Sequence, residues 1–275
     1  MVMVDGISKS FETQLVLKPT TFLLKPNSIV GLCGRNGVGK TTLLKLMLNI
    51  NIPDTGVIVR EYAHAKVIFD MPPQLDSFKI KHFLELFALI YRGEKLEKKE
   101  VCLILERVNM RVSPEKKVGK LSFGMKKMLY ISTLLLGQTD FAVIDEPFNG
   151  LDPISISIVK SIVLEIKEKY GATIIISSHL LNELSEMCEH FLVVKNCDVR
   201  YIDDISSTNA VLKITYDNDE RMLGILEKFG TIIESALNYC EIYLNDGVYS
   251  SDVVQALNQA GIVFREIYYK NVFDI

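Results

Sequence analysis

A glycine-rich segment near the N-terminus has the residue types and spacing of a phosphate-binding loop. Gly34 is followed, after four residues, by Gly39, Lys40 and Thr41. Glycines let the backbone curl so that several N–H groups point at one anion, and the lysine amine neutralises phosphate charge. A threonine hydroxyl at this place is suited to hold Mg²⁺. The predicted phosphate-binding residues are Gly34, Arg35, Asn36, Gly37, Val38, Gly39, Lys40, Thr41 and Thr42.

Two carboxylates, Asp145 and Glu146, directly follow the apolar run 141–144. A buried strand that ends in acidic residues brings them to the carboxyl edge of a sheet, where α/β folds bind their ligands. There Asp145 would hold Mg²⁺, directly or through water. Glu146 would orient and deprotonate an attacking water. Together with the loop, this pair predicts hydrolysis of a nucleotide phosphate, and the alternative is an exposed turn at the end of a strand.

The elements that position these groups can be read from the hydrophobic pattern. Residues 28–33 predict a short buried strand before the loop, and residues 43–50 have apolar positions at helical spacing after it. Further strands are predicted at 141–144 and 172–176, with a helix between them that ends at Gly171. Residues from about 70 to 137 predict a mostly helical insertion. The expected fold class is therefore α/β.

The C-terminal part has a different order of elements. Strand and helix patterns alternate as βαββαβ between residues 211 and 269, which suits a small α+β unit of ferredoxin-like type. Residues 206–209, Ser-Ser-Thr-Asn, predict the linker. The expected domains are 1–205 and 206–275.

Three further motifs complete a family pattern. Residues 121–124, Leu-Ser-Phe-Gly, are similar to a signature that normally reads Leu-Ser-Gly-Gly-Gln. Residues 149–152, Asn-Gly-Leu-Asp, resemble a D-loop, and residues 177–179, Ser-Ser-His, resemble the segment that carries a switch histidine. In this order the motifs resemble the ATP-binding subunits of ATP-binding cassette (ABC) transporters. The resemblance covers residues 34–179 and implies a P-loop NTPase cassette with a mixed sheet, antiparallel edge strands and a helical subdomain.

The resemblance implies that ATP and Mg²⁺ are bound and that two cassettes dimerise head to tail around two ATP molecules. The partner chain's nucleotide would then be contacted by Leu121, Ser122, Phe123, Gly124 and Met125. Asp152 would couple the two sites, and His179 would contact the γ-phosphate. Phe11 sits where the family places an aromatic ring that stacks on adenine, and its alternative is ordinary core packing. The catalytic residues implied are Glu146, His179 and Lys40.

The sequence departs from the family pattern at three places. Phe123 stands at the first signature glycine, and Met125 stands at the usual glutamine. The run Met-Lys-Lys at 125–127 resembles a variant found in exporters of drugs and antimicrobial peptides. The Q-loop residue, a Gln or Glu in the family, is Asp70 by spacing or Gln74 by residue type. We favour Asp70, which can also ligate Mg²⁺.

Composition limits the remaining choices. The 275 residues carry a formal net charge of −3, which leaves no global footprint for nucleic acid. Mean hydropathy is +0.21, yet no apolar run approaches the ~20 residues of a membrane span. We therefore expect an ATPase that powers a transporter whose permease is a separate multi-span subunit, docked on apolar groups around Phe78, Phe83, Phe87 and Tyr91.

The expected location is the cytoplasmic face of the cell membrane. The expected second partner is another copy of the ATPase, as a homodimer, with a heterodimer left open. The Met-Lys-Lys variant favours export of a drug, antimicrobial peptide or lipid-like substrate. The alternative is a soluble cassette ATPase in a non-transport assembly, such as an iron–sulfur assembly scaffold.

Overall fold

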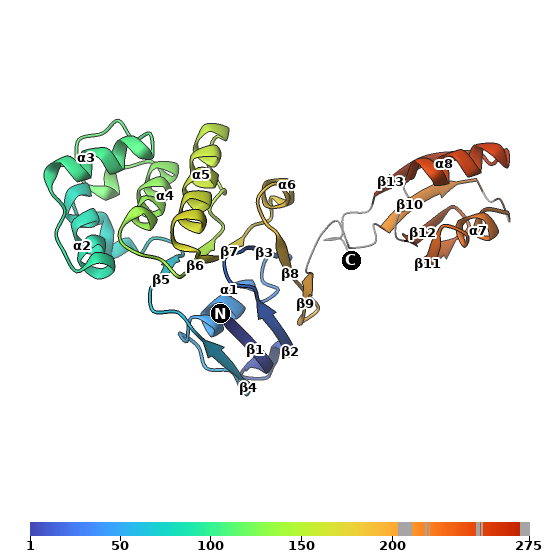
Figure 1. Cartoon of the computed structure of the whole chain (residues 1–275), viewed down its shortest axis with the longest axis horizontal. Helices are drawn as coiled ribbons and strands as arrows, with labels where there is room; N and C mark the ends of the chain where they lie inside the picture. Colours follow the sequence, from blue (N-terminus) through green and yellow to red (C-terminus); the bar gives the residue numbers. More distant parts are fainter. Residues whose placement is uncertain (203–210, 218, 220, 246–247, 249, 270–275) are drawn as a thin grey trace. The chain divides into compact units, whose positions relative to one another are not determined.

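The computed structural model describes residues 1–202, 211–217, 219, 221–245, 248 and 250–269 (Figure 1). They belong to two compact units, 1–202 and 203–275. The predicted linker, 206–209, lies outside the described residues. Among the helices that are described, every one falls short of the length and apolar character that a membrane span requires.

A six-stranded sheet forms the centre of the first unit. In spatial order its strands are β5 (Ala65–Ile68), β6 (Phe141–Asp145), β7 (Thr173–Ser177), β3 (Ile29–Cys33), β8 (His190–Lys195) and β9 (Asp198–Ile202). Neighbouring strands are parallel from β5 to β8, and β9 runs antiparallel to β8. Strands β3 and β7 are buried along their whole length. Their continuous apolar sequences follow from this, because both faces of a parallel sheet are covered.

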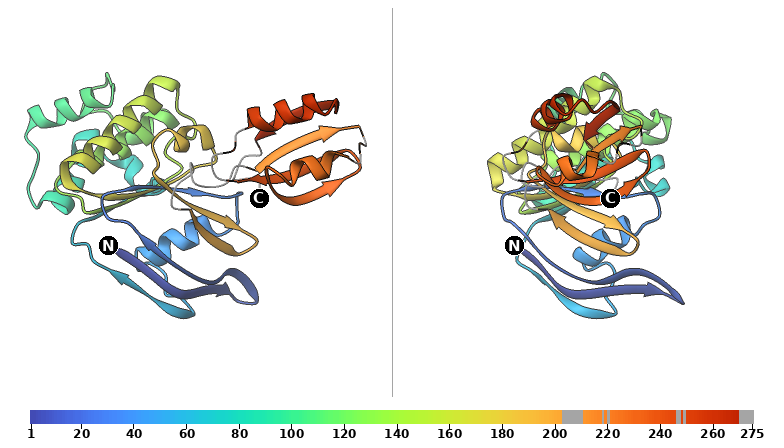
Figure 2. Two further views of the ribbon diagram at one scale, coloured as in Figure 1. Left: turned by 45° about the vertical axis from the view of Figure 1, so that its right-hand side comes forward. Right: turned by 90° about the vertical axis from the view of Figure 1, so that its right-hand side faces the viewer.

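A second, antiparallel sheet packs below the first. It consists of β2 (Gln14–Leu24), β1 (Val2–Phe11) and β4 (Thr55–Arg60), in that order. Helix α1 (Lys40–Met47) lies between the two sheets (Figure 2). Leu43 and Leu44 of α1 share one apolar core with Val4 and Leu24 of the second sheet and with Leu32 of β3. This core fixes the start of α1, and with it the glycine-rich loop, against the end of β3.

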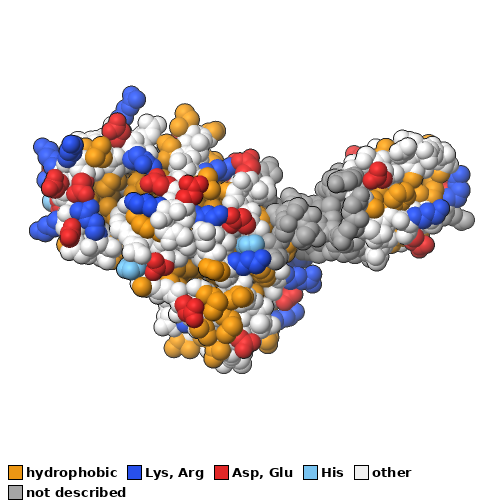
Figure 3. Space-filling model, in the orientation of Figure 1, with side chains coloured by type: hydrophobic (Ala, Val, Ile, Leu, Met, Phe, Trp, Pro, Cys, Tyr) orange, Lys and Arg blue, Asp and Glu red, His pale blue; other side chains and the backbone are white. Residues whose placement is uncertain are grey.

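The outer face of the second sheet carries exposed apolar side chains. Met3 of β1 pairs with Leu23 of β2 and with Val59 of β4, and all three are exposed. Hydrophobic side chains gather over this part of the molecule in Figure 3. Part of the high mean hydropathy therefore lies on the surface of this sheet.

The segment 70–137, which the sequence predicts to be mostly helical, forms most of the helical layer of the first unit. Its helices are η1 (Pro73–Ser77), α2 (Ile80–Arg92), α3 (Lys98–Arg107), η2 (Val118–Lys120), α4 (Phe123–Ser132) and η3 (Thr133–Leu135). Helix α5 (Pro153–Tyr170) follows β6, and the short α6 (Leu181–Ser185) follows β7. Gly171 ends α5 in the left-handed conformation, with φ of 64°, as its predicted C-cap role requires.

The apolar docking surface predicted around Phe78, Phe83, Phe87 and Tyr91 is wrong for two of these four residues. Phe83 is fully buried and Phe87 is only 8% exposed. The two rings contact each other, and both contact Tyr130 of α4. Positions four apart share one face of a helix, and here that face is the inner one. The outer face of α2 exposes Leu89 and Ile90 instead.

The second unit has the element order βαββαβ. Its elements are β10 (Val211–Tyr216), α7 (Arg221–Leu226), β11 (Gly230–Ala236), β12 (Tyr239–Leu244), α8 (Ser250–Gln259) and β13 (Phe264–Tyr269). The strands form an antiparallel sheet in the order β11-β12-β10-β13. Leu226 of α7 and Leu257 of α8 pack with Ile214 and Ile242 in a separate apolar core.

Candidate active site

The loop between β3 and α1 curls around the amine of Lys40. Lys40 Nζ donates to the carbonyl oxygens of Gly34, at 2.7 Å, and Arg35, at 3.4 Å. A Cβ on Gly34 would lie 2.5 Å from the carbonyl oxygen of Val194, and its φ of 147° suits only glycine. Gly39, with φ of 114°, leads directly into α1. Residues 35–37 are exposed, so the loop presents its backbone to solvent at a helix N-terminus.

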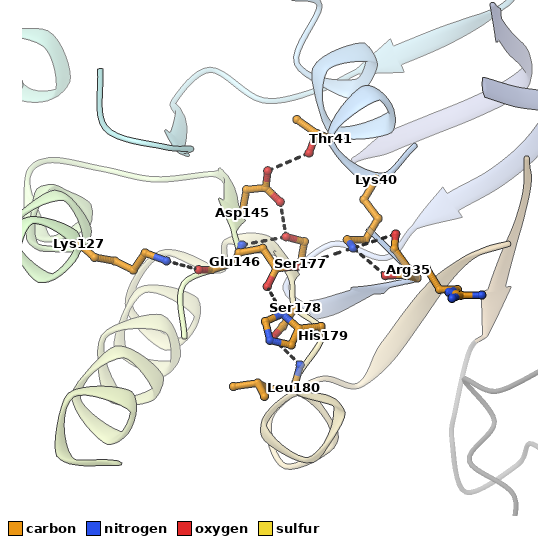
Figure 4. A network of polar contacts seen from close by, with 11 residues as sticks. Arg35, Lys40, Thr41, Lys127, Asp145, Glu146, Ser177, Ser178, His179 and Leu180 are labelled. Atoms are coloured by element: carbon orange, nitrogen blue, oxygen red, sulfur yellow. Dashed lines mark hydrogen bonds and ion pairs between the residues drawn. The ribbon is translucent and has the colours of Figure 1, made fainter. Parts of the chain in front are cut away.

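Asp145, the last residue of β6, faces the start of α1. Its Oδ2 accepts a hydrogen bond from the Thr41 hydroxyl at 3.0 Å, and its Oδ1 accepts one from the Ser177 hydroxyl. Ser177 is the last residue of the neighbouring strand β7, so its contact with Asp145 follows from the order of the sheet (Figure 4). Thr41 and Asp145, two of the three residues predicted to hold Mg²⁺, therefore lie side by side.

Glu146 lies at the centre of the site in an uncommon backbone conformation. Its φ is 49°, in the left-handed region that non-glycine residues seldom occupy. Its N–H donates to Ser177, both to the hydroxyl at 2.9 Å and to the carbonyl oxygen at 3.1 Å. Its carboxylate oxygen Oε1 lies 3.7 Å from Lys40 Nζ and is buried without a hydrogen-bond partner among the described residues. The hydrogen-bonding capacity of this oxygen is therefore unused in this structure.

His179 approaches the other carboxylate oxygen of Glu146. Its Nδ1 lies 2.9 Å from Oε2, while its side chain is half exposed (Figure 4). Asp145, Glu146 and His179 thus come together at the carboxyl ends of the adjacent strands β6 and β7, next to the loop that follows β3. The structure brings the three predicted catalytic residues, Lys40, Glu146 and His179, into one connected group.

The signature residues lie at the start of α4. The Ser122 hydroxyl accepts a hydrogen bond from the Met125 N–H at 3.3 Å and caps the helix. Ser122 and Phe123 are exposed, Gly124 and Met125 are partly exposed, and Leu121 is buried. The helix N-terminus and its exposed residues are therefore open to a molecule other than this chain.

Asp152 caps the next helix, α5. Its carboxylate accepts hydrogen bonds from the Ser155 N–H, at 2.9 Å, and from the Ser155 hydroxyl, at 3.1 Å. The bond from the backbone N–H is the main cause that lowers the pKa of Asp152. Asp152 is exposed and carries a negative charge near the signature side of the cassette: Leu151, its neighbour, lies within contact distance of a Cβ built on Gly124.

A cavity of about 380 Å³ lies between the sheet edge and α4. Asp70 lines it together with Asp145 and Lys127. Gln74, the other candidate for the Q-loop, is exposed on η1 and does not line this cavity. The geometry therefore favours Asp70, which shares a cavity with the carboxylate expected to hold Mg²⁺.

Phe11 is 47% exposed at the end of β1, with the Lys9 amine 5.4 Å from its ring centre. It pairs with Gln14 across the hairpin that joins β1 to β2. Further along β2, Val16 and Leu17 lie against Gly39 of the glycine-rich loop. The hairpin thus packs beside the loop, and Phe11 is not a core residue.

Sequence reasoning missed two contributors to the site, Ser177 and Lys127. The family pattern gives Ser177 only as part of the histidine segment. A hydroxyl at the end of a strand that neighbours β6 is the signal for its contacts with Asp145 and Glu146. The Lys127 amine donates to the carbonyl oxygen of Glu146 at 2.6 Å (Figure 4). It also donates to the carbonyl oxygen of Asn149 at 3.1 Å. No spacing rule in the sequence indicates these contacts of Lys127.

The donor set fits Mg²⁺ bound together with a nucleotide. Thr41 and Asp145 supply a hydroxyl and a carboxylate oxygen, the hard ligands that this ion prefers. Among the described residues there is no group of three or more His, Cys, Asp or Glu side chains that could hold a metal ion by themselves. Mg²⁺ in phosphate-transfer sites uses one or two protein ligands and completes its shell with phosphate oxygens and water. The site therefore suits a metal that arrives with its substrate.

The chain is similar in sequence to ATP-binding proteins of transporters. It is 27% identical over 245 residues to the uncharacterized ABC transporter ATP-binding protein YcbN of Bacillus subtilis, covering 83% of this chain and 78% of that protein. It is 31% identical to the bacitracin transport ATP-binding protein BcrA of Enterococcus faecalis, covering 67% of this chain and 63% of that protein. It is 30% identical to the Nod factor export ATP-binding protein I of Burkholderia thailandensis, covering 69% and 66%. The chain thus spans slightly less than two thirds of the last two relatives.

A family model and solved structures also resemble this chain. The model described as ABC transporter matches residues 17–149. An ATP-binding subunit of an ABC transporter superposes with a TM-score of 0.68 at 26% identity, covering 76% of this chain and 92% of that chain. A nucleotide-free ATP-binding cassette shares the fold with a TM-score of 0.63 at 22% identity, covering 74% and 91%. The chain therefore carries an ATP-binding domain of the ABC transporter family, a class of domain that hydrolyses ATP.

Proposed function

We propose that this chain binds ATP and Mg²⁺ on the loop 34–42 and hydrolyses the ATP to power a membrane transporter. The observation that carries the proposal is the position of Glu146. Its carboxylate lies between Lys40 and His179, and Oε1 has no hydrogen-bond partner within the described part of the chain. Lys40 is 7% exposed and its amine is held in the curl of the loop, where a bound phosphate would replace the loop carbonyl oxygens as its partner.

In this proposal Glu146 acts on the attacking water. Its Oε1 accepts a proton as the water oxygen bonds to the γ-phosphorus and the bond between that phosphorus and ADP breaks. His179 holds Oε2 through Nδ1, which leaves Oε1 as the oxygen that takes the proton. Thr41 and Asp145 would hold Mg²⁺, with Asp70 at the same cavity. When bound, this ion neutralises phosphate charge and orients the phosphate oxygens.

The exposed signature supports a dimer in which each nucleotide is shared by two chains. Ser122, the Gly124 N–H and the N-terminus of α4 are hydrogen-bond donors suited to a γ-phosphate, and they lie at the protein surface. Asp152, close to this surface, is placed to couple the two sites. Phe11, on the hairpin beside the phosphate loop, is placed to stack on adenine.

The transporter part of the proposal draws on the relatives' names. One relative serves bacitracin transport and another serves Nod factor export. We infer that the partner is a separate multi-span permease at the cytoplasmic face of the membrane, and that the substrate is a drug, antimicrobial peptide or lipid-like compound. Copurification of the chain with a multi-span protein from detergent-solubilised membranes tests this. A chain found only as a free, fully active ATPase would contradict it.

Phosphate release by the purified full chain with Mg²⁺ and ATP is the first test of hydrolysis. Lys40→Met removes the amine and keeps the length of the side chain, so we expect turnover to fall ~100-fold or more, because the phosphate charge is then unmatched. Lys45→Met, in the last turn of the same helix, is the matched control and should retain turnover within ~2-fold. Equal loss in both variants, or none in Lys40→Met, would contradict the proposed role of the loop.

A further inference from the structure

Lys127 connects the signature helix to the turn that carries Glu146. It belongs to α4, and its amine donates to the carbonyl oxygens of Glu146, at 2.6 Å, and Asn149, at 3.1 Å. The amine also lies 5.2 Å from the centre of the Phe123 ring. An ammonium group has three donors and a favourable interaction with an aromatic face. In this structure the Lys127 amine donates two hydrogen bonds to the turn and also lies over the Phe123 ring.

The conformation of Glu146 gives this contact its importance. A glutamate with φ of 49° is held against its own backbone preference and persists only where its surroundings fix it. Ser177 fixes the N–H side of the residue. Lys127 fixes the carbonyl side and ties it to Asn149, three residues further along the turn. The buried side chain of Phe148 anchors the middle of the turn.

Phe123 completes this arrangement. A Cβ built on Gly150 would lie 2.9 Å from the Phe123 ring, so the ring rests directly against the backbone of Gly150, whose φ is 74°. The ring and the turn therefore enclose the Lys127 amine from two sides. Burial lowers the pKa of Lys127, while the carboxylates of Asp70, Glu146 and Asp145 favour its charged form. The amine is thus surrounded by groups that direct it to the turn.

We propose that Lys127 is a positioning residue that holds Glu146 in its left-handed conformation and aims the carboxylate into the nucleotide site. This inference rests on the proposed role of Glu146 as the base. Lys127 belongs to α4, the helix that Ser122 caps. In the proposed dimer the start of this helix would contact the partner chain's nucleotide. Lys127 therefore links that contact to Glu146 of its own site. Movement of α4 would change the position of Glu146 through this side chain.

The neighbouring lysine provides a matched control. Lys126 lies on the same helix and lines the same cavity, but its amine pairs with the carboxylate of Asp76, at 2.7 and 2.8 Å. Among the residues that the structure describes, its amine makes no hydrogen bond with the turn at residues 146–149. Replacement of either lysine by methionine removes one charge from the same region, and only Lys127→Met removes the hydrogen bonds to the turn.

The test is the steady-state kcat and KM for ATP of the full chain and three variants. We expect Lys127→Met to lower kcat ~10-fold or more while KM for ATP changes less than ~3-fold, because the phosphate loop is untouched. Lys127→Arg keeps a charged donor and should recover most of the lost kcat. Lys126→Met should stay within ~2-fold of the wild-type kcat. A thermal melt of each variant separates loss of positioning from loss of folding, and Lys127→Gln, which keeps a shorter donor, replaces any variant that does not fold.

Several outcomes would overturn the inference. These are an unchanged kcat in Lys127→Met, a rise in KM that accounts for the whole loss, or equal losses in the two methionine variants. Failure of arginine to recover any activity would also count against it. The proposed function fails separately: a wild-type chain without turnover, or Glu146→Gln with near-normal turnover, would refute the role of Glu146. Either of these results would overturn the inference about Lys127 as well.

Discussion

At the scale of single residues, the site depends on contacts that connect neighbouring strands. The resemblance to ABC ATP-binding subunits identified His179, while spacing identified Lys40, Asp145 and Glu146, because each follows a glycine-rich pattern or an apolar strand. It did not reveal the left-handed conformation of Glu146 or the contacts of Lys127, since both depend on how distant segments pack. It also left Asp70 and Gln74 as alternatives, which only the cavity beside Asp145 separates.

Ser177 offers a test at this scale. Its hydroxyl joins the Asp145 carboxylate to the Glu146 N–H. Ser177→Ala should lower kcat for ATP ~10-fold and cost about 1–3 kcal/mol in the free energy of unfolding, because a buried hydrogen bond to a charged group is lost. Steady-state turnover and urea unfolding measure these two effects.

Ser132→Ala is the matched control for this variant. Ser132 is equally buried, and its hydroxyl donates only to the Leu129 carbonyl oxygen within α4. We expect a loss of stability there without a comparable loss of turnover. If both variants reduced kcat to the same degree, the effect would come from stability rather than from the Asp145–Glu146 connection.

At the scale of elements, the hydrophobic pattern predicted the strands that end at the site and the helices around them. It gave no prediction for β1 and β2, whose residues alternate irregularly because the hairpin contains register shifts. It also placed Phe83 and Phe87 on a docking surface, because apolar content does not reveal which face of a helix is covered.

The attachment of the helical layer to the sheet includes an unusual buried lysine. Lys66 of the edge strand β5 donates to the carbonyl oxygens of Leu134, at 2.9 Å, and Gly137, at 3.1 Å.

The pKa of Lys66 predicts a dependence of stability on pH. Burial, with a smaller effect of Lys169, lowers this pKa to about 7. The unfolded chain, with the ordinary lysine pKa of ~10.4, then binds more protons than the folded chain between these values. The cost of burying Lys66 is therefore greatest below pH 7 and disappears as the pH rises towards the unfolded pKa, so this residue makes stability rise with pH.

Comparison with Lys66→Met isolates this contribution. The variant loses the two hydrogen bonds but has no titrating group, so other pH effects cancel in the difference between the two proteins. We expect the stability of the wild type relative to the variant to rise by up to ~1.4 kcal/mol per pH unit between about pH 7 and 10. Urea unfolding at a series of pH values measures it. A pH-independent difference would show that Lys66 keeps an ordinary pKa in the folded chain.

At the scale of the whole molecule, the described site residues all lie within the first unit, and the second unit has its own apolar core. The high mean hydropathy without a spanning helix among the described residues is accounted for in part by the outer face of the second sheet and by exposed positions on α2. We propose that ATP joins two such chains and that Glu146 ends the complex by hydrolysing ATP.

The most direct test of that claim is the mass of the full chain in solution after addition of Mg²⁺ and ATP, followed over time by light scattering. The wild type should form a dimer that returns to monomer as ATP is consumed. Glu146→Gln keeps the shape of the side chain but cannot take up the proton, so we expect its dimer to persist for at least ~100-fold longer. A Glu146→Gln chain that remains monomeric, or that dissociates as quickly as the wild type, would contradict the account.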